Sequence, residues 1–178
     1  MTIYIFTGTS FNDCYNFLPK KNICSNYSED KVKQIVRWQI DGIKKKNANN
    51  ILIIFDDVMG LEKEMKKPIY KKLVSEYRHY KITFIFSVQY IKGFASPLFR
   101  ECTTYTYIFR TLGKNSVEAI FENFMGDFDN WKEVRKFIDD NTKKKHNFLL
   151  IIIMIIKDIQ FGGRLLIFQI INFLFNIY

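Results

Sequence analysis

The hydrophobic and polar positions of this chain form short continuous apolar runs that are separated by segments with helical spacing. The apolar runs lie at residues 2–7 (TIYIFT), 51–55 (ILIIF), 81–89 (KITFIFSVQ) and 104–110 (TYTYIFR). The run ILIIF shows no alternation and is rich in β-branched residues, which is typical of a strand that is buried on both faces. We therefore predict four β-strands from these runs.

Segments with helical spacing lie between the predicted strands. After Ser28, which is a good N-cap, apolar side chains recur three and four positions apart, and lysines fill the last turn. Further helices are predicted from Pro68 onward, in one or two turns at residues 96–102, and at about residues 115–125 and 129–140. This alternation predicts an α/β fold with a parallel sheet and three layers.

The expected domain organisation is one α/β domain over residues 1–146, followed by an apolar strand and tail over residues 147–178. The run NFLLIIIMII at residues 147–156 fits a last core strand, and LLIFQIINFLFNIY at residues 165–178 has no charged side chain. Both runs are shorter than the roughly 18–20 residues that span a bilayer. The end of the chain is thus residual core or a non-native tail, a membrane attachment, or a surface for a partner subunit.

The chain is basic, with 27 Lys and Arg against 18 Asp and Glu and a net charge of +9. Five short clusters carry many of the lysines: Lys20-Lys21, Lys44-Lys45-Lys46, Lys66-Lys67, Lys71-Lys72 and Lys143-Lys144-Lys145. They are interpreted either as solvated helix ends and loops or as a surface that follows the phosphates of nucleic acid. AT-rich coding would also explain the abundance of lysine, so the charge alone assigns no partner.

Three cysteines, Cys14, Cys24 and Cys102, form no CxxC pair, and their odd number argues against a secreted disulfide framework. The first residues, MTIYIFTGTS, contain no basic leader and too short an apolar run for a signal peptide. We therefore expect a reducing, intracellular compartment.

Two adjacent carboxylates, Asp56 and Asp57, directly follow the apolar run ILIIF. In an open α/β sheet, ligands bind beyond the carboxyl ends of the strands. A carboxylate that a buried strand holds there is well placed to bind Mg²⁺ through water, and a neighbouring acid can orient or deprotonate an attacking water. Many strands also end in Asp as a helix cap or turn former, so both interpretations stay open at this point.

The next predicted strand also ends in polar residues, Ser87 and Gln89. The ends of adjacent parallel strands lie about 5 Å apart. We therefore expect Gln89 to reach the same site, where its amide can bond both a water and a phosphate oxygen. Solvation of the strand end is the alternative role of Gln89.

The run ILIIFDDVMG, followed by EYRHYKITFIFSVQYIKGFASPLFRECTTYTYIF, resembles the genome-packaging ATPases of poxviruses and other large DNA viruses, which belong to the FtsK–HerA superfamily. The matching features are the paired acids after a strand, a strand ending in Ser-x-Gln, a Pro-x-x-Arg segment and a further strand. The resemblance implies a P-loop NTPase fold of the ASCE type. For the complete family member it implies ATP and Mg²⁺ as ligands and ATP-driven translocation of double-stranded DNA without sequence specificity.

The resemblance also implies roles for individual residues. Asp56 matches the acid that holds magnesium, and Asp57 the acid that polarises water. Gln89 matches the glutamine that senses the γ-phosphate. Arg100 matches an arginine that acts across a subunit boundary like an arginine finger, or it simply pairs with a nearby carboxylate.

The phosphate cradle of that family is absent from this chain, because no GxxxxGKS or GxxxxGKT sequence occurs in it. The run IFTGTSFNDCYNF matches the family's second strand, so we expect the chain to begin after the P-loop strand and helix. The resemblance places that strand between residues 81–87 and residues 104–110, and its loss would leave two strand edges without a neighbour.

We therefore expect the chain alone neither to bind ATP tightly nor to hydrolyse it. A homo-oligomeric ring or a companion chain that supplies the P-loop would complete the site, in a virion, the host cytoplasm or a viral factory. The alternatives are a non-catalytic α/β binding or structural module, and a small membrane-associated protein that attaches through its apolar tail.

Overall fold

The computed structural model describes residues 1–9, 13–58, 60–94, 96–154 and 165–169. The chain forms two compact units, Met1–Tyr90, here the first unit, and Ile91–Tyr178, here the second unit. This division differs from the expected one between residues 146 and 147, which stays a prediction. The part of the predicted tail at residues 170–178 lies outside the described residues.

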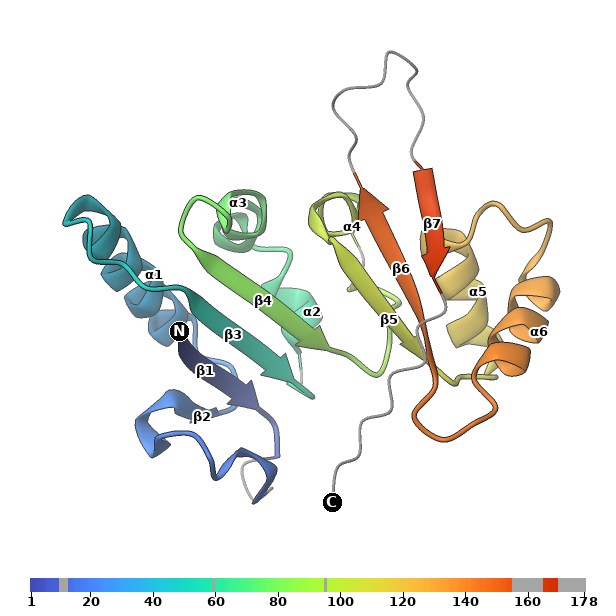
Figure 1. The fold of residues 1–178 in the computed structure, drawn as a ribbon, viewed down its shortest axis with the longest axis horizontal. Helices are drawn as coiled ribbons and strands as arrows, with labels where there is room; N and C mark the ends of the chain where they lie inside the picture. The colour runs from blue at the N-terminus through green and yellow to red at the C-terminus, as the bar shows by residue number, and fades with distance from the viewer. Residues whose placement is uncertain (10–12, 59, 95, 155–164, 170–178) are drawn as a thin grey trace, which may run out of the picture. The chain divides into compact units, whose positions relative to one another are not determined.

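The first unit contains a parallel sheet of four strands in the order β2-β1-β3-β4 (Figure 1). Its strands are β1 (Thr2–Thr7), β2 (Ile23–Ser25), β3 (Ile51–Asp56) and β4 (Ile82–Ser87). The predicted α/β class with a parallel sheet is confirmed. Strand β2 was not predicted, because three residues are too few to show a period.

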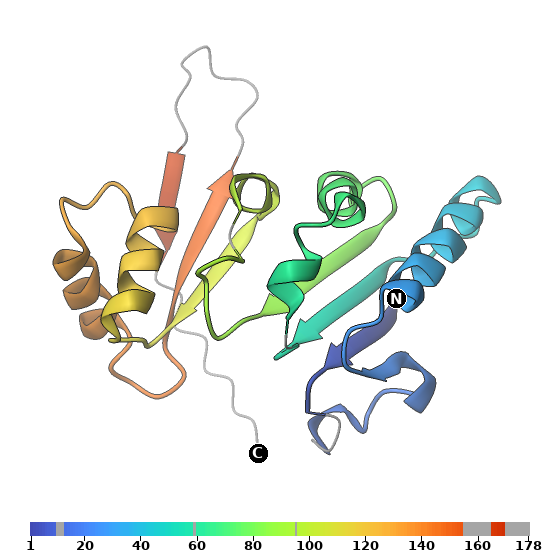
Figure 2. The ribbon, with the colours of Figure 1, turned by 180° about the vertical axis from the view of Figure 1, so that it is seen from behind.

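The helices of the first unit are α1 (Glu29–Lys44), α2 (Leu61–Glu64) and α3 (Pro68–Glu76), with short 3-10 turns η1 (Asp13–Tyr15) and η2 (Lys20–Asn22). Helix α1 begins as predicted, since the Ser28 side chain accepts a hydrogen bond from the backbone N–H of Lys31. Both α1 and α2 lie on the same face of the sheet (Figure 2).

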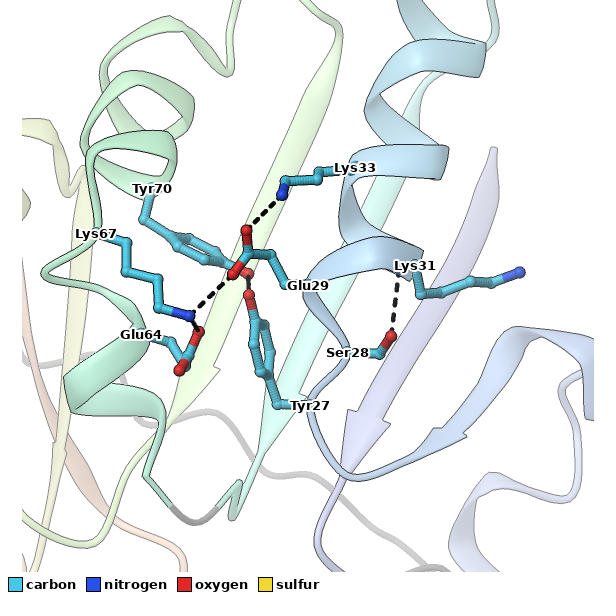
Figure 3. Close-up of polar contacts among 8 residues, drawn as sticks. All are labelled: Tyr27, Ser28, Glu29, Lys31, Lys33, Glu64, Lys67 and Tyr70. Atoms are coloured by element: carbon cyan, nitrogen blue, oxygen red, sulfur yellow. Dashed lines mark hydrogen bonds and ion pairs between the residues drawn. The ribbon is translucent and has the colours of Figure 1, made fainter.

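The sheet face under these helices is aromatic. The register aligns Phe6, Phe55 and Phe86 across β1, β3 and β4, and their rings stack at centroid distances of 5.0 and 5.1 Å. The hydroxyl of the buried Tyr70 of α3 donates a hydrogen bond to the hydroxyl of Tyr27 (Figure 3). The ring of Tyr27 also packs near Phe55. A row of stacked aromatic rings is thus part of the core of the first unit, beside buried aliphatic side chains such as Ile35 and Ile53.

The opposite face of the sheet is less buried. Along β3, Ile51, Ile53 and Phe55 are buried, whereas Leu52 and Ile54 are only half-buried. The predicted burial of this strand on both faces is therefore complete on one face and partial on the other. The reason lies in the arrangement of the layers, because α1 and α2 cover one face of the sheet and the described residues of the first unit add no helix to the other.

An ion-pair cluster joins the start of α1 to the segment between α2 and α3 (Figure 3). The Glu29 carboxylate accepts from Lys33 at 2.5 Å and from Lys67 at 2.9 Å, and Lys67 also contacts Glu64 at 2.6 Å. Hydrogen bonds from Lys33 and Lys67 lower the pKa of Glu29 to about 2. Of the lysines in the five clusters, Lys67 is therefore a partner of two carboxylates.

The second unit contains an antiparallel sheet of three strands in the order β5-β6-β7. Its elements are α4 (Pro97–Cys102), β5 (Tyr105–Phe109), α5 (Lys114–Phe124), α6 (Trp131–Asn141), β6 (Phe148–Met154) and β7 (Leu165–Gln169). The helices lie close to their predicted bounds, and the run at residues 147–156 does provide a strand, β6.

Strand β5 differs from the prediction of one parallel sheet, because it pairs with β6 in antiparallel register. Its inward side chain Ile108 joins a core made by α5, α6 and β6, and the buried members of that core are Ile108, Val117, Ile120, Met125, Val134, Ile138, Leu149 and Ile151. Within the described part of the chain, β4 and β5 each have a single strand neighbour.

No helix of the described residues is long and apolar enough to cross a bilayer.

Candidate functional site

Polar side chains gather where the parallel strands of the first unit end. The register aligns Thr7 of β1 with Asp56 of β3, and Asp56 with Ser87 of β4. Because the three strands are parallel, these residues lie at the same carboxyl edge of the sheet, which is where open α/β sheets bind ligands. The sequence predicted this place for Asp56.

The first acid, Asp56, is half-buried and accepts a hydrogen bond from the hydroxyl of Tyr15. Tyr15 comes from η1, in a loop for which the sequence showed no period, so pattern analysis missed it. Burial, and then the hydrogen bond to the Asp56 carboxylate, raise the pKa of Tyr15. The phenol therefore stays protonated and keeps donating to Asp56.

The second acid, Asp57, leaves the strand with a left-handed backbone, at a φ of 49°. Its neighbour across the sheet edge is Gly8, where an added Cβ would lie 2.4 Å from the Asp57 carbonyl oxygen. The amide of Gly8 also donates to the Asp56 carbonyl oxygen at 3.3 Å. A glycine at this position is thus required by close backbone approach, and it lets the turn after Asp56 pack against the end of β1.

Gln89 contacts the second acid directly. Its side-chain amide donates to the Asp57 carboxylate over 2.7 Å, and both residues are exposed. The structure therefore brings Asp56, Asp57 and Gln89 together at one edge of the sheet. Their chemical roles stay predictions.

Arg100 lies in α4 of the second unit and is half-buried. Its guanidinium donates to the side-chain oxygen of Asn123 in α5 at 3.0 Å. The amide of Asn123 is in turn held by the Ala119 carbonyl oxygen at 2.7 Å. Within the described residues, Arg100 therefore contacts the side chain of an asparagine. Its role stays a prediction.

Solved structures of a viral protein have a similar fold. The genome packaging NTPase B204 from Sulfolobus turreted icosahedral virus 2, in complex with AMP, is similar with a TM-score of 0.54 and 15% sequence identity over 85% of this chain and 77% of that chain. The structure of the same protein in complex with AMPPCP is similar with a TM-score of 0.53 and 18% sequence identity. The match covers 84% of this chain and 76% of that chain. This chain has the fold of a viral genome-packaging NTPase.

A further structure with this packaging-NTPase fold is B204, described as the DNA-packaging ATPase from Sulfolobus turreted icosahedral virus, at a TM-score of 0.53 and 15% identity over 84% and 77% of the two chains. No protein-family model matches the sequence, and no curated protein matches it significantly. The three-dimensional arrangement, and not the sequence identity, connects this chain to that fold.

The oxygen donors at the strand ends fit one kind of metal site. Among the described residues, no three His, Cys, Asp or Glu side chains are grouped as metal ligands. Mg²⁺ in nucleotide sites needs no such cage, because one or two carboxylates hold it together with waters and phosphate oxygens. Asp56 and Asp57 fit that smaller ligand set.

Proposed function

We propose that this chain is a partial DNA-packaging ATPase domain, which carries the metal-and-water end of a nucleotide site and does not hydrolyse ATP by itself. The observation that supports the proposal best is the 2.7 Å hydrogen bond between Gln89 and Asp57, next to Asp56, at the carboxyl edge of a parallel sheet. The similar B204 structures contain AMP, ATP-gammaS or AMPPCP, which supports a nucleotide as the ligand class.

In this proposal, each strand-end residue has one task. Asp56 would hold Mg²⁺, which supplies neutralisation of phosphate charge when bound, and Asp57 would orient the attacking water. Gln89 already contacts Asp57, so its amide would link the water to the terminal phosphate. Tyr15 would position Asp56 through its hydroxyl.

The remainder of the site would come from another polypeptide. The sequence has no GxxxxGKS or GxxxxGKT loop, so the backbone amides and the lysine that cradle phosphates would be supplied by a neighbouring subunit or a companion chain. To act as an arginine finger, Arg100 would have to exchange its contact with Asn123 for a phosphate. In this proposal, the basic surface of the chain, whose net charge is +9, would follow the phosphates of double-stranded DNA without reading its sequence.

The same missing loop favours one alternative, a non-catalytic α/β module that has kept the fold without the nucleotide. An ATPase assay separates activity from inactivity: the pure chain is expected to show no Mg²⁺-dependent turnover. Turnover by the pure chain that Asp57→Ala abolishes would contradict the proposed inactivity. Turnover restored by a co-expressed polypeptide carrying GxxxxGKS or GxxxxGKT, and lost again in Asp57→Ala, would contradict the non-catalytic alternative.

Metal binding at the strand ends can be measured without activity. Mn²⁺, a paramagnetic stand-in for Mg²⁺, is expected to broaden the NMR signals of Asp56, Asp57 and Gln89 first. The Asp56→Asn variant should lose this local broadening, whereas Asp139→Asn in α6 of the second unit should keep it. Broadening that is spread evenly over the acidic surface residues would show that the strand ends form no metal site.

A further inference from the structure

The parallel sheet of the first unit has a second edge, which the amino ends of its long strands form and which is here called the amino edge. The register aligns the first residues of β1, β3 and β4, which are Thr2, Ile51 and Ile82. The loops that precede β3 and β4, residues 45–50 and 77–81, therefore lie side by side (Figure 1). Hydrogen bonds connect them, since the Ile51 amide donates to the Lys81 carbonyl oxygen at 3.0 Å and the Lys81 ammonium donates to the Ala48 carbonyl oxygen at 3.5 Å. The two loops thus form one continuous surface.

The amino edge is strongly basic. Its exposed cationic side chains are Lys44, Lys45, Lys46, Arg78 and Lys81. In the part of the chain that the structure describes, none of the four lysines among them forms an ion pair, whereas Lys67 near the start of α1 pairs with two carboxylates. The acids nearest along the chain are Asp41, which is exposed, and Glu76, whose carboxylate accepts a hydrogen bond from the hydroxyl of Tyr80. Cationic groups therefore outnumber carboxylates on this surface.

Two of these lysines lie where the backbone favours glycine. The φ angle is 56° at Lys46 and 52° at Lys81, in the left-handed region that glycine adopts without steric cost and lysine rarely adopts. The helix dipole accounts for Lys44 and Lys45 at the end of α1, and not for Lys81, which directly precedes β4. Strained backbone of this kind concentrates at functional sites. Both positions therefore indicate a role for the lysine side chain rather than for the turn.

The neighbouring polar side chains suit a phosphate backbone. The Nε of Arg78 donates to the Tyr77 hydroxyl at 2.9 Å, and the guanidinium lies over the Tyr77 ring at 5.5 Å from its centroid. A guanidinium held in this way loses less freedom when it binds a phosphate. The exposed amides of Asn47, Asn49 and Asn50 can donate to phosphate and sugar oxygens. The two loops contain no exposed apolar side chain, which attachment to a membrane surface would require.

We propose that the amino edge of the first unit binds the phosphate backbone of double-stranded DNA without reading its sequence. The choice of double-stranded DNA as the partner rests on the proposed function, whereas the location of the surface rests on its charges and backbone. Strand β3 has six residues, so this surface lies about 17 Å from the carboxylates at the opposite edge. DNA and the metal are therefore bound at opposite ends of the same strands and do not compete.

Glycine substitutions at the two left-handed positions separate binding from folding. The double variant with Lys46→Gly and Lys81→Gly removes two positive charges and relieves the backbone at both positions, so it should melt no lower than the unmodified chain. Its affinity for a short fluorescein-labelled duplex should nevertheless fall about tenfold or more at low salt. The slope of the logarithm of the binding constant against the logarithm of salt concentration should become smaller by about 2, because two phosphate contacts are lost. Fluorescence anisotropy with the pure full chain measures both quantities.

A second pair of variants provides a repeat and a matched control within one helix. Lys44→Ala with Lys45→Ala, at the amino edge, should weaken duplex binding by a similar factor. Lys31→Ala with Lys33→Ala removes the same charge from the first turns of α1, about 17–20 Å from Lys44 along the helix axis. This distance exceeds the Debye length of about 10 Å at about 0.1 M salt, so the control should leave the affinity nearly unchanged.

NMR locates the bound duplex independently of any substitution. The duplex is expected to shift the signals of residues 44–50 and 77–81, whereas Mn²⁺ is expected to broaden those of Asp56, Asp57 and Gln89. Duplexes of unrelated sequence should shift the same signals to the same extent, because phosphate contacts carry no sequence information.

Any one of four results would overturn the proposal. They are no binding of duplex at low salt, including the case in which the chain binds vesicles of phosphatidylserine and phosphatidylcholine instead, equal losses in the glycine variant and the Lys31 and Lys33 control, unchanged affinity in both amino-edge variants, and signal shifts that lie outside the two loops. Equal losses would mean that net charge attracts DNA without a defined surface. The ATPase and Mn²⁺ measurements use none of these lysines, so failure of this surface and failure of the proposed function can be told apart.

Discussion

In the first unit, the carboxyl ends of the strands lie at one edge of the sheet. In the second unit, they alternate between two opposite edges. In the first unit, parallel strands place Thr7, Asp56 and Ser87 at one edge, where polar chemistry can accumulate. In the second unit, antiparallel strands alternate in direction, and the exposed groups lie along the aromatic face of β5 instead. Strand direction therefore decides where the strand ends gather: the parallel strands place their carboxyl ends at one edge, whereas the antiparallel strands place them alternately at two opposite edges.

The largest expected effect is the loss of unfolding free energy when a buried side chain in the core of either unit is truncated to alanine. Phe55→Ala removes the central ring of the stack in the first unit and should lower the free energy of unfolding by about 3–5 kcal/mol. Ile138→Ala in the second unit should cost about 2–5 kcal/mol. Urea unfolding measures both losses.

Hydrogen exchange on the same variants sharpens the comparison between the two units. Phe55→Ala should increase exchange mainly in β1, β3 and β4, and Ile138→Ala mainly in β5, β6 and α6. Equal acceleration over both units in each variant would show that the chain opens as one cooperative body, and the distinction drawn between the units would fail.

A smaller effect is expected at the carboxylate edge. In Gly8→Ala the new Cβ would lie 2.4 Å from the Asp57 carbonyl oxygen, so the backbone must shift, at a cost of about 1–3 kcal/mol in unfolding free energy. Gly126→Ala in the second unit is the matched control, because nothing lies within 4 Å of its Cβ, and it should change stability by less than about 0.5 kcal/mol. Equal thermal stability of the two variants would refute the close approach at Gly8.

The smallest expected effect is the pH dependence of the Glu29 cluster. The folded-state pKa of Glu29, about 2, lies below its ordinary value of 4.5. The contribution of the ionised Glu29 carboxylate to stability is therefore fully present above pH 4.5 and is lost as the pH falls through about 2. Glu29→Gln should melt slightly below the unmodified chain at neutral pH, and the difference should disappear near pH 2. Salt should reduce it, because the pair is exposed.

The corresponding variant of the second unit is Asp140→Asn, since a hydrogen bond from Lys143 lowers the pKa of Asp140 in the same direction. Thermal melts of both variants from pH 7 to pH 2 make the comparison. A melting difference for Glu29→Gln that grows as the pH falls would contradict the assigned sign.

Patterns of apolar residues predicted most of the helices and strands, because a buried stripe or run requires many residues that follow one period. They did not predict β2, which has three residues, nor the contact of Tyr15 with Asp56, because the two residues are far apart in sequence. They also missed the antiparallel direction of β5. Strand direction depends on which neighbour provides backbone hydrogen bonds, and no local pattern encodes that choice.

The sequence by itself determined the α/β class, the place of Asp56 and Asp57 at a strand end, and the absence of a GxxxxGKS or GxxxxGKT loop. These features depend on local order along the chain. Only the tertiary structure decided that Gln89 contacts Asp57, that Gly8 must lack a side chain, and that the aromatic face of β5 is exposed. Each of these depends on the distance between segments that are remote in sequence, and packing sets that distance.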